Sequence, residues 1–387
     1  MPYVGRILIR TVVVVAALGV PLMPSTADSQ ATLKVGGSIA YVFSKNLQSG
    51  TGELLAFDTQ TGAVVNRMEE TYGVQLPELL VNPDGSSLYV LEGRVLKGGK
   101  VLMNTLSLID TRSWKVVATT EVPQRMQYIV VGPGTMILSP DGSRLFVYSY
   151  QVTGPQQARY WLSIYQPVSL MLQQKRIPLP GCGVAYFAAV PGQIIAECFD
   201  SNDVRFISIR RMKVVATVHL PSWARLGGVG LFVSHDQGTA YVLTIDLRII
   251  ALSTTKHRIV QKITAFRQAT QSIPSLYGAA VSGGQLIVGS MARWKDPESP
   301  FSLRPFFLPS FKPLKPVPLP RYTHFAAAPG GGVLTFPMGD SSDRDWRIQL
   351  LSPDLSQTKP LLQLNGPVFQ LAVPSAALDG RLSGGLP

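Results

Sequence analysis

A hairpin pattern that recurs along this chain constrains the fold more than any other feature of the sequence. Residues 136–147 form a short apolar segment, the turn Ser-Pro-Asp-Gly-Ser, and a second segment that alternates around Leu145 and Val147. In such a turn proline fixes φ, aspartate accepts hydrogen bonds from nearby backbone, and glycine tolerates a positive φ. The pattern returns at residues 79–90, with weaker copies at 188–192, 232–236, 279–284 and 326–331. A repeated hairpin indicates a repeat architecture.

A second hairpin completes each unit, with aspartate at the start of its turn in the first two units and altered turns in the later ones. Asp58 and Asp110 each follow an apolar segment and precede another strand-like segment, and aspartate at such a position can form an Asx-turn. Anchor residues of successive units lie 44 to 57 residues apart: Pro83, Pro140, Pro191, His235, Gly283, Pro329 and Pro374. Units of about 40–50 residues with four strands predict an all-β fold, a β-propeller of four-stranded antiparallel blades.

The two ends of the chain decide the number of blades. The first unit begins at residues 39–43 with what would be its second strand, and residues 368–374 have the pattern of an inner strand with no unit after it. Pairing these two segments completes one blade and removes the open sheet edges that invite aggregation. We therefore predict that residues 28–387 form one seven-bladed propeller, closed by the C-terminal strand in the first blade.

The first residues have the composition of an export signal. Arg6 and Arg10 precede an apolar run over residues 11–20, and Ala27 ends a small-residue cleavage site. We predict that residues 1–27 are a signal peptide and that the protein is periplasmic or secreted; an uncleaved N-terminal anchor is the alternative. No other stretch has the length and apolar character of a transmembrane helix.

The formal net charge of +12 points to the chemistry of partners. An exported protein rarely meets nucleic acid, and the basic residues are scattered rather than massed, so we expect no nucleic-acid partner. A basic surface that docks an acidic protein or an anionic envelope surface is one interpretation, and plain solubility is the other.

Residues 297–320 are irregular because they hold eight prolines, which cannot all lie within a hydrogen-bonded ladder. We predict a long loop and an outer edge strand around Phe306 to Phe311. A polyproline docking site for a partner is a further possibility that the sequence leaves open.

The links between second and third strands are expected to gather on one rim, where function on a rigid scaffold commonly resides. The predicted links are residues 45–52, 92–104, 150–159, 290–302 and 339–345. The candidate binding residues on this rim and at the channel entrance are Gln48, Arg94, Lys97, Arg159, Arg293, His324 and Asp343. The alternative is that these side chains are merely solvated.

Residue patterns for catalysis or metal binding are scarce. The four histidines are His219, His235, His257 and His324, and none has the spacing of a metal motif. No nucleophile elbow or phosphate-binding loop is present. His235 and His257 fall on predicted turns, whereas His324 precedes a predicted inner strand near the channel entrance. We predict no catalytic residue, metal or cofactor in this chain.

Cys182 and Cys198 are equidistant from residue 190, at the turn of the fourth hairpin. This spacing places them opposite one another on antiparallel strands, close enough to bridge, and export favours oxidation. We predict a disulfide; two buried free thiols are the alternative.

The segment 121–205 resembles the heavy chain of quinone-dependent amine dehydrogenases, such as methylamine dehydrogenase. The shared residues are 136–142, 145–148, 179–182, 189–192 and Cys198, and the cysteine pair within one blade is the more specific part. The resemblance implies a periplasmic seven-bladed propeller paired with a small, disulfide-rich light chain that carries a tryptophan-derived quinone. In the family a long N-terminal arm precedes the first blade, and a phenylalanine lies at the channel where this sequence has Gln48.

These observations leave three hypotheses. The first is a non-catalytic subunit, similar to an amine-dehydrogenase heavy chain, that serves as the scaffold for a light chain. The second is a stand-alone propeller that binds a protein or an envelope glycan through its loop-rich rim. The third is a lactonase-like hydrolase, a class that usually places His, Glu and Arg around the channel.

Overall fold

The computed structural model describes residues 38–45, 51–70, 74–95, 101–122, 135–154, 157–224, 226, 230–234, 236–244, 248–264, 275–282, 284–291, 301–308, 310–320, 323–337, 346–366 and 368–373. The chain divides into two units, Met1–Lys34 and Val35–Pro387, and the fold below is that of the second. The predicted signal peptide lies outside the described residues. Nothing helical in the described ranges has the length and apolar character needed to cross a bilayer.

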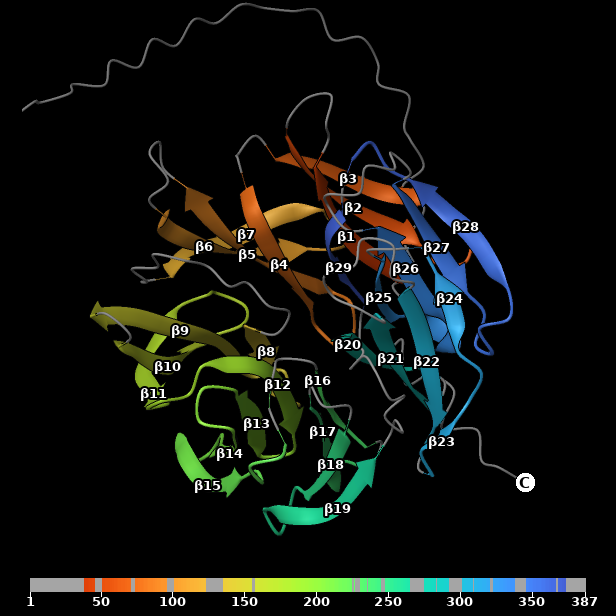
Figure 1. Cartoon of the computed structure of the whole chain (residues 1–387). Helices are drawn as coiled ribbons and strands as arrows, with labels where there is room; N and C mark the ends of the chain where they lie inside the picture. The colour runs from red at the N-terminus through yellow and green to blue at the C-terminus, as the bar shows by residue number, and fades with distance from the viewer. Residues whose placement is uncertain are drawn as a thin grey trace, which may run out of the picture. The chain divides into compact units, whose positions relative to one another are not determined.

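The described strands form seven antiparallel sheets, numbered here as blades 1 to 7 and listed from the innermost strand outward (Figure 1). Blade 1 contains β29 (Val368–Ala372), β1 (Ile39–Lys45), β2 (Gly52–Asp58) and β3 (Val64–Glu70). Blade 2 contains β4 (Val74–Val81), β5 (Ser87–Val95), β6 (Val101–Asp110) and β7 (Lys115–Val122). Blade 3 contains β8 (Met136–Leu138), β9 (Leu145–Gly154), β10 (Gln157–Tyr165) and β11 (Leu172–Pro178).

The remaining blades follow the same plan. Blade 4 contains β12 (Val184–Val190), β13 (Gln193–Cys198), β14 (Asp203–Ser208) and β15 (Lys213–His219). Blade 5 contains β16 (Gly230–Val233), β17 (Thr239–Leu243), β18 (Arg248–Ser253) and β19 (Arg258–Thr264). Blade 6 contains β20 (Ser275–Ser282), β21 (Gln285–Met291), β22 (Phe301–Phe307), β23 (Lys312–Pro313) and β24 (Val317–Leu319). Blade 7 contains β25 (Thr323–Ala327), a 3-10 turn at Pro329–Gly331, β26 (Val333–Pro337), β27 (Arg347–Leu351) and β28 (Thr358–Gln363).

The closure predicted from the chain ends is confirmed. β29 pairs with β1 in antiparallel register, with Val42 opposite Leu371 and Phe43 opposite Gln370. Inner strands of successive blades also contact one another in order, from β29 to β4 and onward to β25. The fold is therefore the seven-bladed β-propeller that the hairpin repeat predicts.

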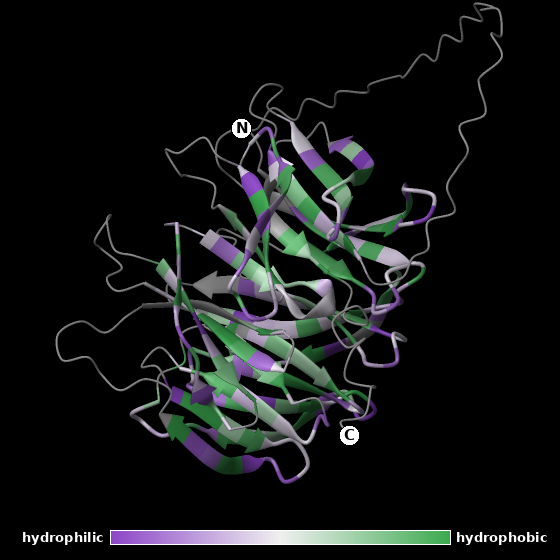
Figure 2. Cartoon of the chain, turned by 90° about the vertical axis from the view of Figure 1, so that its right-hand side faces the viewer, coloured by the Kyte–Doolittle hydropathy of each residue, from purple (hydrophilic) through white to green (hydrophobic). Residues whose placement is uncertain are grey.

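The core consists of seven apolar clusters, each formed between two neighbouring blades. Alternation along each strand builds them: on β5, Leu88 and Val90 pack toward blade 1, whereas Tyr89 and Leu91 pack toward blade 3. The alternation of hydrophobic and hydrophilic residues is visible along the strands in Figure 2. Because both faces of a blade are buried, each blade is held by its two neighbours.

The turns confirm the predicted chemistry. Asp58 Oδ1 accepts hydrogen bonds from the backbone N–H groups of Gln60 and Thr61, and Asp110 Oδ1 accepts them from Arg112 and Ser113. These are the expected Asx-turns between third and fourth strands.

Blade 6 corrects the prediction for the proline-rich segment. Phe306 lies in the third strand, β22, opposite Leu286, and the outer edge is formed by the short strands β23 and β24. Pro305 lies inside β22, and its carbonyl accepts a hydrogen bond from the N–H of Leu314, which lies between the two edge strands. The N and C=O of one residue point to the same side of a strand, so the missing N–H of Pro305 faces this interrupted edge.

Candidate binding site on blades 3 and 4

The structure places only three of the predicted binding residues. Arg94 lies within β5, opposite Met103, so strands occupy part of the predicted link. Arg159 lies on β10 opposite Gln151 and its side chain is exposed. His324 lies within the inner strand β25. The other candidates, Gln48, Lys97, Arg293 and Asp343, lie outside the described residues.

His324 is half-buried and stacks on Phe336, with ring centroids 5.6 Å apart and an interplanar angle of 17°. Burial lowers the pKa of its imidazole, which favours the neutral ring at pH 7. Phe336 belongs to the apolar cluster between blades 7 and 1, so this histidine packs against the core at the inner strand. Arg159, on blade 3, is not brought together with it.

The predicted disulfide is present. Cys182 and Cys198 are bonded, with a Cα–Cα distance of 4.7 Å, and both are fully buried. Their positions differ from the predicted ladder because the turn lies at residues 191–192, between Val190 and Gln193, rather than at residue 190, and a bulge between Val184 and Tyr186 then places Val184 opposite Cys198. Cys182 therefore precedes β12, in a tight turn where its N–H donates to the carbonyl of Leu179.

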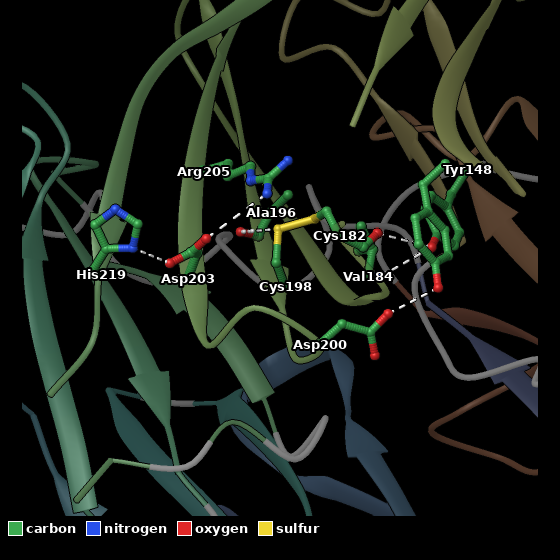
Figure 3. Close-up of a disulfide and its surroundings, with 10 residues drawn as sticks. Tyr148, Cys182, Val184, Ala196, Cys198, Asp200, Asp203, Arg205 and His219 are labelled. Atoms are coloured by element: carbon green, nitrogen blue, oxygen red, sulfur yellow. Dashed lines mark hydrogen bonds and ion pairs between the residues drawn. A yellow bond between two sulfur atoms is a disulfide. The ribbon is translucent and has the colours of Figure 1, made fainter. Parts of the chain in front are cut away.

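An aromatic cluster surrounds this disulfide. Tyr148 lies 6.0 Å from Tyr160 in a stacked arrangement, 6.4 Å from Tyr150 and 6.0 Å from Phe187 of blade 4. The Tyr148 hydroxyl donates to the carbonyl of Cys182 at 3.1 Å and accepts from the N–H of Val184 at 3.1 Å (Figure 3). The buried phenol thus ties blade 3 to both sides of the turn that carries Cys182.

The loop after Cys198 presents polar and apolar groups beside this cluster. The Tyr160 hydroxyl donates to Asp200 Oδ2 at 2.8 Å, and the adjacent Phe199 is 48% exposed. Burial, the hydrogen bond to Asp200 and the charge of that carboxylate together raise the pKa of Tyr160 to about 12. Tyr160 therefore remains a neutral donor at physiological pH. We call Tyr150, Tyr160, Phe199 and Asp200 the aromatic rim.

A charged group lies farther along blade 4. Asp203 is buried, and its Oδ1 lies 2.5 Å from Nδ1 of the exposed His219, while its Oδ2 lies 3.8 Å from Nη2 of the buried Arg205. Figure 3 shows Asp203 connected by dashed lines to both side chains. In the registers of β14, Asp203 pairs with Cys198 and His219, so all three face blade 3.

Sequence reasoning missed the aromatic rim and this charged group. The alternation of Tyr148 and Tyr150 on one strand was a usable signal that they share a face. The partners Asp200 and Phe187 belong to the next blade, and no local pattern indicates them. In the described ranges, no three His, Cys, Asp or Glu side chains gather closely enough to hold a metal ion.

No protein-family model matches the chain, and no curated protein matches it. Among solved structures it is similar to the periplasmic gluconolactonase PpgL of Pseudomonas aeruginosa, at 16% identity, with a TM-score of 0.58 over 87% of this chain and 99% of that chain. It is also similar to the dihydro-heme d1 dehydrogenase NirN, at 11% identity and a TM-score of 0.53, over 93% and 78% of the two chains. A third similar structure is the hydrazine synthase of Kuenenia stuttgartiensis, at 17% identity and a TM-score of 0.51, over 73% and 78%. What these likenesses establish is the β-propeller fold.

Proposed function

We propose that this chain is an exported, non-catalytic scaffold that binds a partner protein through the aromatic rim of blades 3 and 4. The observation that carries the proposal is the exposed Phe199, which lies in the chain between Cys198 of the disulfide and Asp200, the hydrogen-bond partner of half-buried Tyr160. Aromatic side chains are enriched at the energetic centres of protein interfaces. A loop fixed by a disulfide also loses less conformational entropy on binding.

Charge and family resemblance favour an acidic subunit as the partner. The formal net charge of +12 favours association with an acidic surface. The rim lies within residues 121–205, the segment that resembles amine-dehydrogenase heavy chains. The specific form of the proposal is therefore a heavy-chain-like scaffold for a small light chain, on which a tryptophan-derived quinone would perform amine oxidation.

Purification of the tagged chain from its native host tests this proposal. We expect a small acidic protein to co-elute with the wild-type chain, and the variant Phe199→Ala to lose most of it. Phe307→Ala is the matched control, because Phe307 on blade 6 is a phenylalanine of similar exposure, 52% against 48% for Phe199. Recovery of the wild-type chain alone, or equal retention of the partner by both variants, would contradict the proposal. Quinone absorbance in the co-eluting protein distinguishes the amine-dehydrogenase form.

Lactone hydrolysis is the second candidate, and it would place catalysis in this chain. The Pseudomonas neighbour is named a gluconolactonase, and the match to this chain covers 99% of its length. His324 on the inner strand is the residue that such an enzyme would have available near its channel. Assay of the purified chain with glucono-δ-lactone in a pH-stat separates the candidates: the scaffold proposal expects no hydrolysis above the uncatalysed rate.

A further inference from the structure

A cavity of about 410 Å³ opens between the outer strands of blades 3 and 4. It is lined by Pro178 and Pro180, which end blade 3, and by Arg205, Lys213, Val214 and Thr217 of blade 4. The size is that of a small-molecule site. The lining combines apolar walls with two cationic side chains and one hydroxyl.

Arg205 is the unusual member of this lining because it is only 9% exposed. No described residue accepts a hydrogen bond from its Nε, and its Nη2 lies 3.8 Å from Asp203 Oδ2, too far for a hydrogen bond. A buried guanidinium whose Nε has no acceptor is costly, since charged groups removed from water require compensating partners. The site is therefore short of an anion.

Asp203 does not fill that need alone. Its Oδ1 lies 2.5 Å from Nδ1 of His219, so the carboxylate is engaged on the side away from Arg205. Arg205 pairs in the ladder with Thr217, which places the guanidinium-bearing residue and this exposed threonine on the same face of blade 4. That face is also the one toward Pro178 and Pro180.

The walls define the rest of the ligand. Proline offers no backbone N–H, and Val214 is apolar, so this part of the cavity favours a hydrocarbon body rather than a polar one. Lys213 adds a second positive charge at the exposed edge. We propose that this cavity binds a small organic carboxylate, with its carboxylate toward Arg205 and Lys213 and its apolar body against the two prolines and Val214.

Binding of 4-fluorobenzoate to the full chain, followed by 19F NMR line broadening, tests the site. We expect saturable binding of the carboxylate and none of the neutral isostere 4-fluorobenzamide. Arg205→Gln should weaken binding by about tenfold or more, because a charged hydrogen-bond donor is lost from a buried position. Lys213→Gln should weaken it by about two- to fivefold, as expected for an exposed charge.

Lys256→Gln is the control, because Lys256 is an exposed lysine in a turn of blade 5 and is not part of the cavity lining. If Arg205→Gln fails to fold, Lys213→Gln and the cavity-filling Val214→Phe still decide the matter, since both alter the half of the lining nearer the surface. Absence of binding, equal binding of 4-fluorobenzamide, or equal affinities for Lys213→Gln and Lys256→Gln would overturn the proposal.

Discussion

Tyr41 of β1 lies opposite Ala372 of β29, although the two residues come from opposite ends of the described chain. This pairing makes the last of the described strands the innermost strand of blade 1. The Tyr41 ring also stacks on Trp114 of blade 2, with centroids 6.1 Å apart. Tyr41 of β1 therefore contacts both the C-terminal strand of its own blade and the second blade.

Removal of β29 should open the ring. A chain that ends at Gly366 lacks β29, the inner strand of blade 1, so β1 becomes an unpaired sheet edge. The apolar side chains that pack with Leu371 between blades 7 and 1 also become exposed. We expect aggregation and loss of a cooperative thermal transition, measured by circular dichroism and size-exclusion chromatography. The control chain ends at Ser375 and keeps β29. Similar melting of both truncated chains would contradict a closed ring.

The propeller was predictable because its signals are local. Each hairpin places its turn residues and its alternating apolar residues within a dozen positions, and closure needed only the incomplete units at the two ends. The disulfide was predictable from symmetric spacing, but the bulge before Tyr186 was not, since no residue type there demands one.

The aromatic rim and the cavity lined by Arg205 depend on contacts between blades. Tyr160 reaches Asp200, and Pro178 and Thr217 line one cavity, across an interface that no short sequence window contains. Blade 6 was misjudged for a related reason: the prolines suggested a loop, whereas the interrupted outer edge lets Pro305 remain inside β22. Turn residues and apolar alternation locate the strands, whereas the packing of neighbouring strands decides where a residue such as Pro305 is tolerated within one.

The disulfide should contribute measurably to stability. A bridge that closes a loop of this length contributes about 3 kcal/mol in the chain-entropy account. Reduction of the wild-type chain should lower the free energy of unfolding by roughly that amount, seen as a lower guanidinium midpoint. The double variant Cys182→Ala/Cys198→Ala should not respond to the reductant. An unchanged midpoint for the reduced wild-type chain would contradict this prediction.

Acid should weaken the blade 3 hairpin. Hydrogen bonds from Ser139 Oγ and from the N–H and Oγ of Ser143 lower the pKa of Asp141 to about 2. Because the pKa in the folded chain lies below the unfolded value, the stabilisation is complete above about pH 4 and is lost as the pH falls through about 2. Asp141→Asn keeps an acceptor oxygen but cannot ionise.

We therefore expect Asp141→Asn to be less stable than the wild type at pH 6, and the difference to shrink at pH 2.5. Urea midpoints at the two pH values measure it. Ser143→Ala is the companion variant, since it removes one donor and should reduce the same pH dependence in part. A difference between Asp141→Asn and wild type that is constant with pH would show that the carboxylate charge plays no role in the turn.

Gly62 is expected to be the least replaceable turn glycine among those compared here. It lies in the Asx-turn of blade 1 with φ at +79°, and a Cβ atom there would collide with the carbonyl of Leu361 in β28 of blade 7. Gly142 has a similar φ of +66° but open space around it. Gly142→Ala should therefore cost only the left-handed strain, about 1–2 kcal/mol, whereas Gly62→Ala must also push blade 7 away from blade 1. We expect a clearly larger fall in the thermal midpoint for Gly62→Ala, and equal falls for the two variants would show that blades 1 and 7 do not approach so closely.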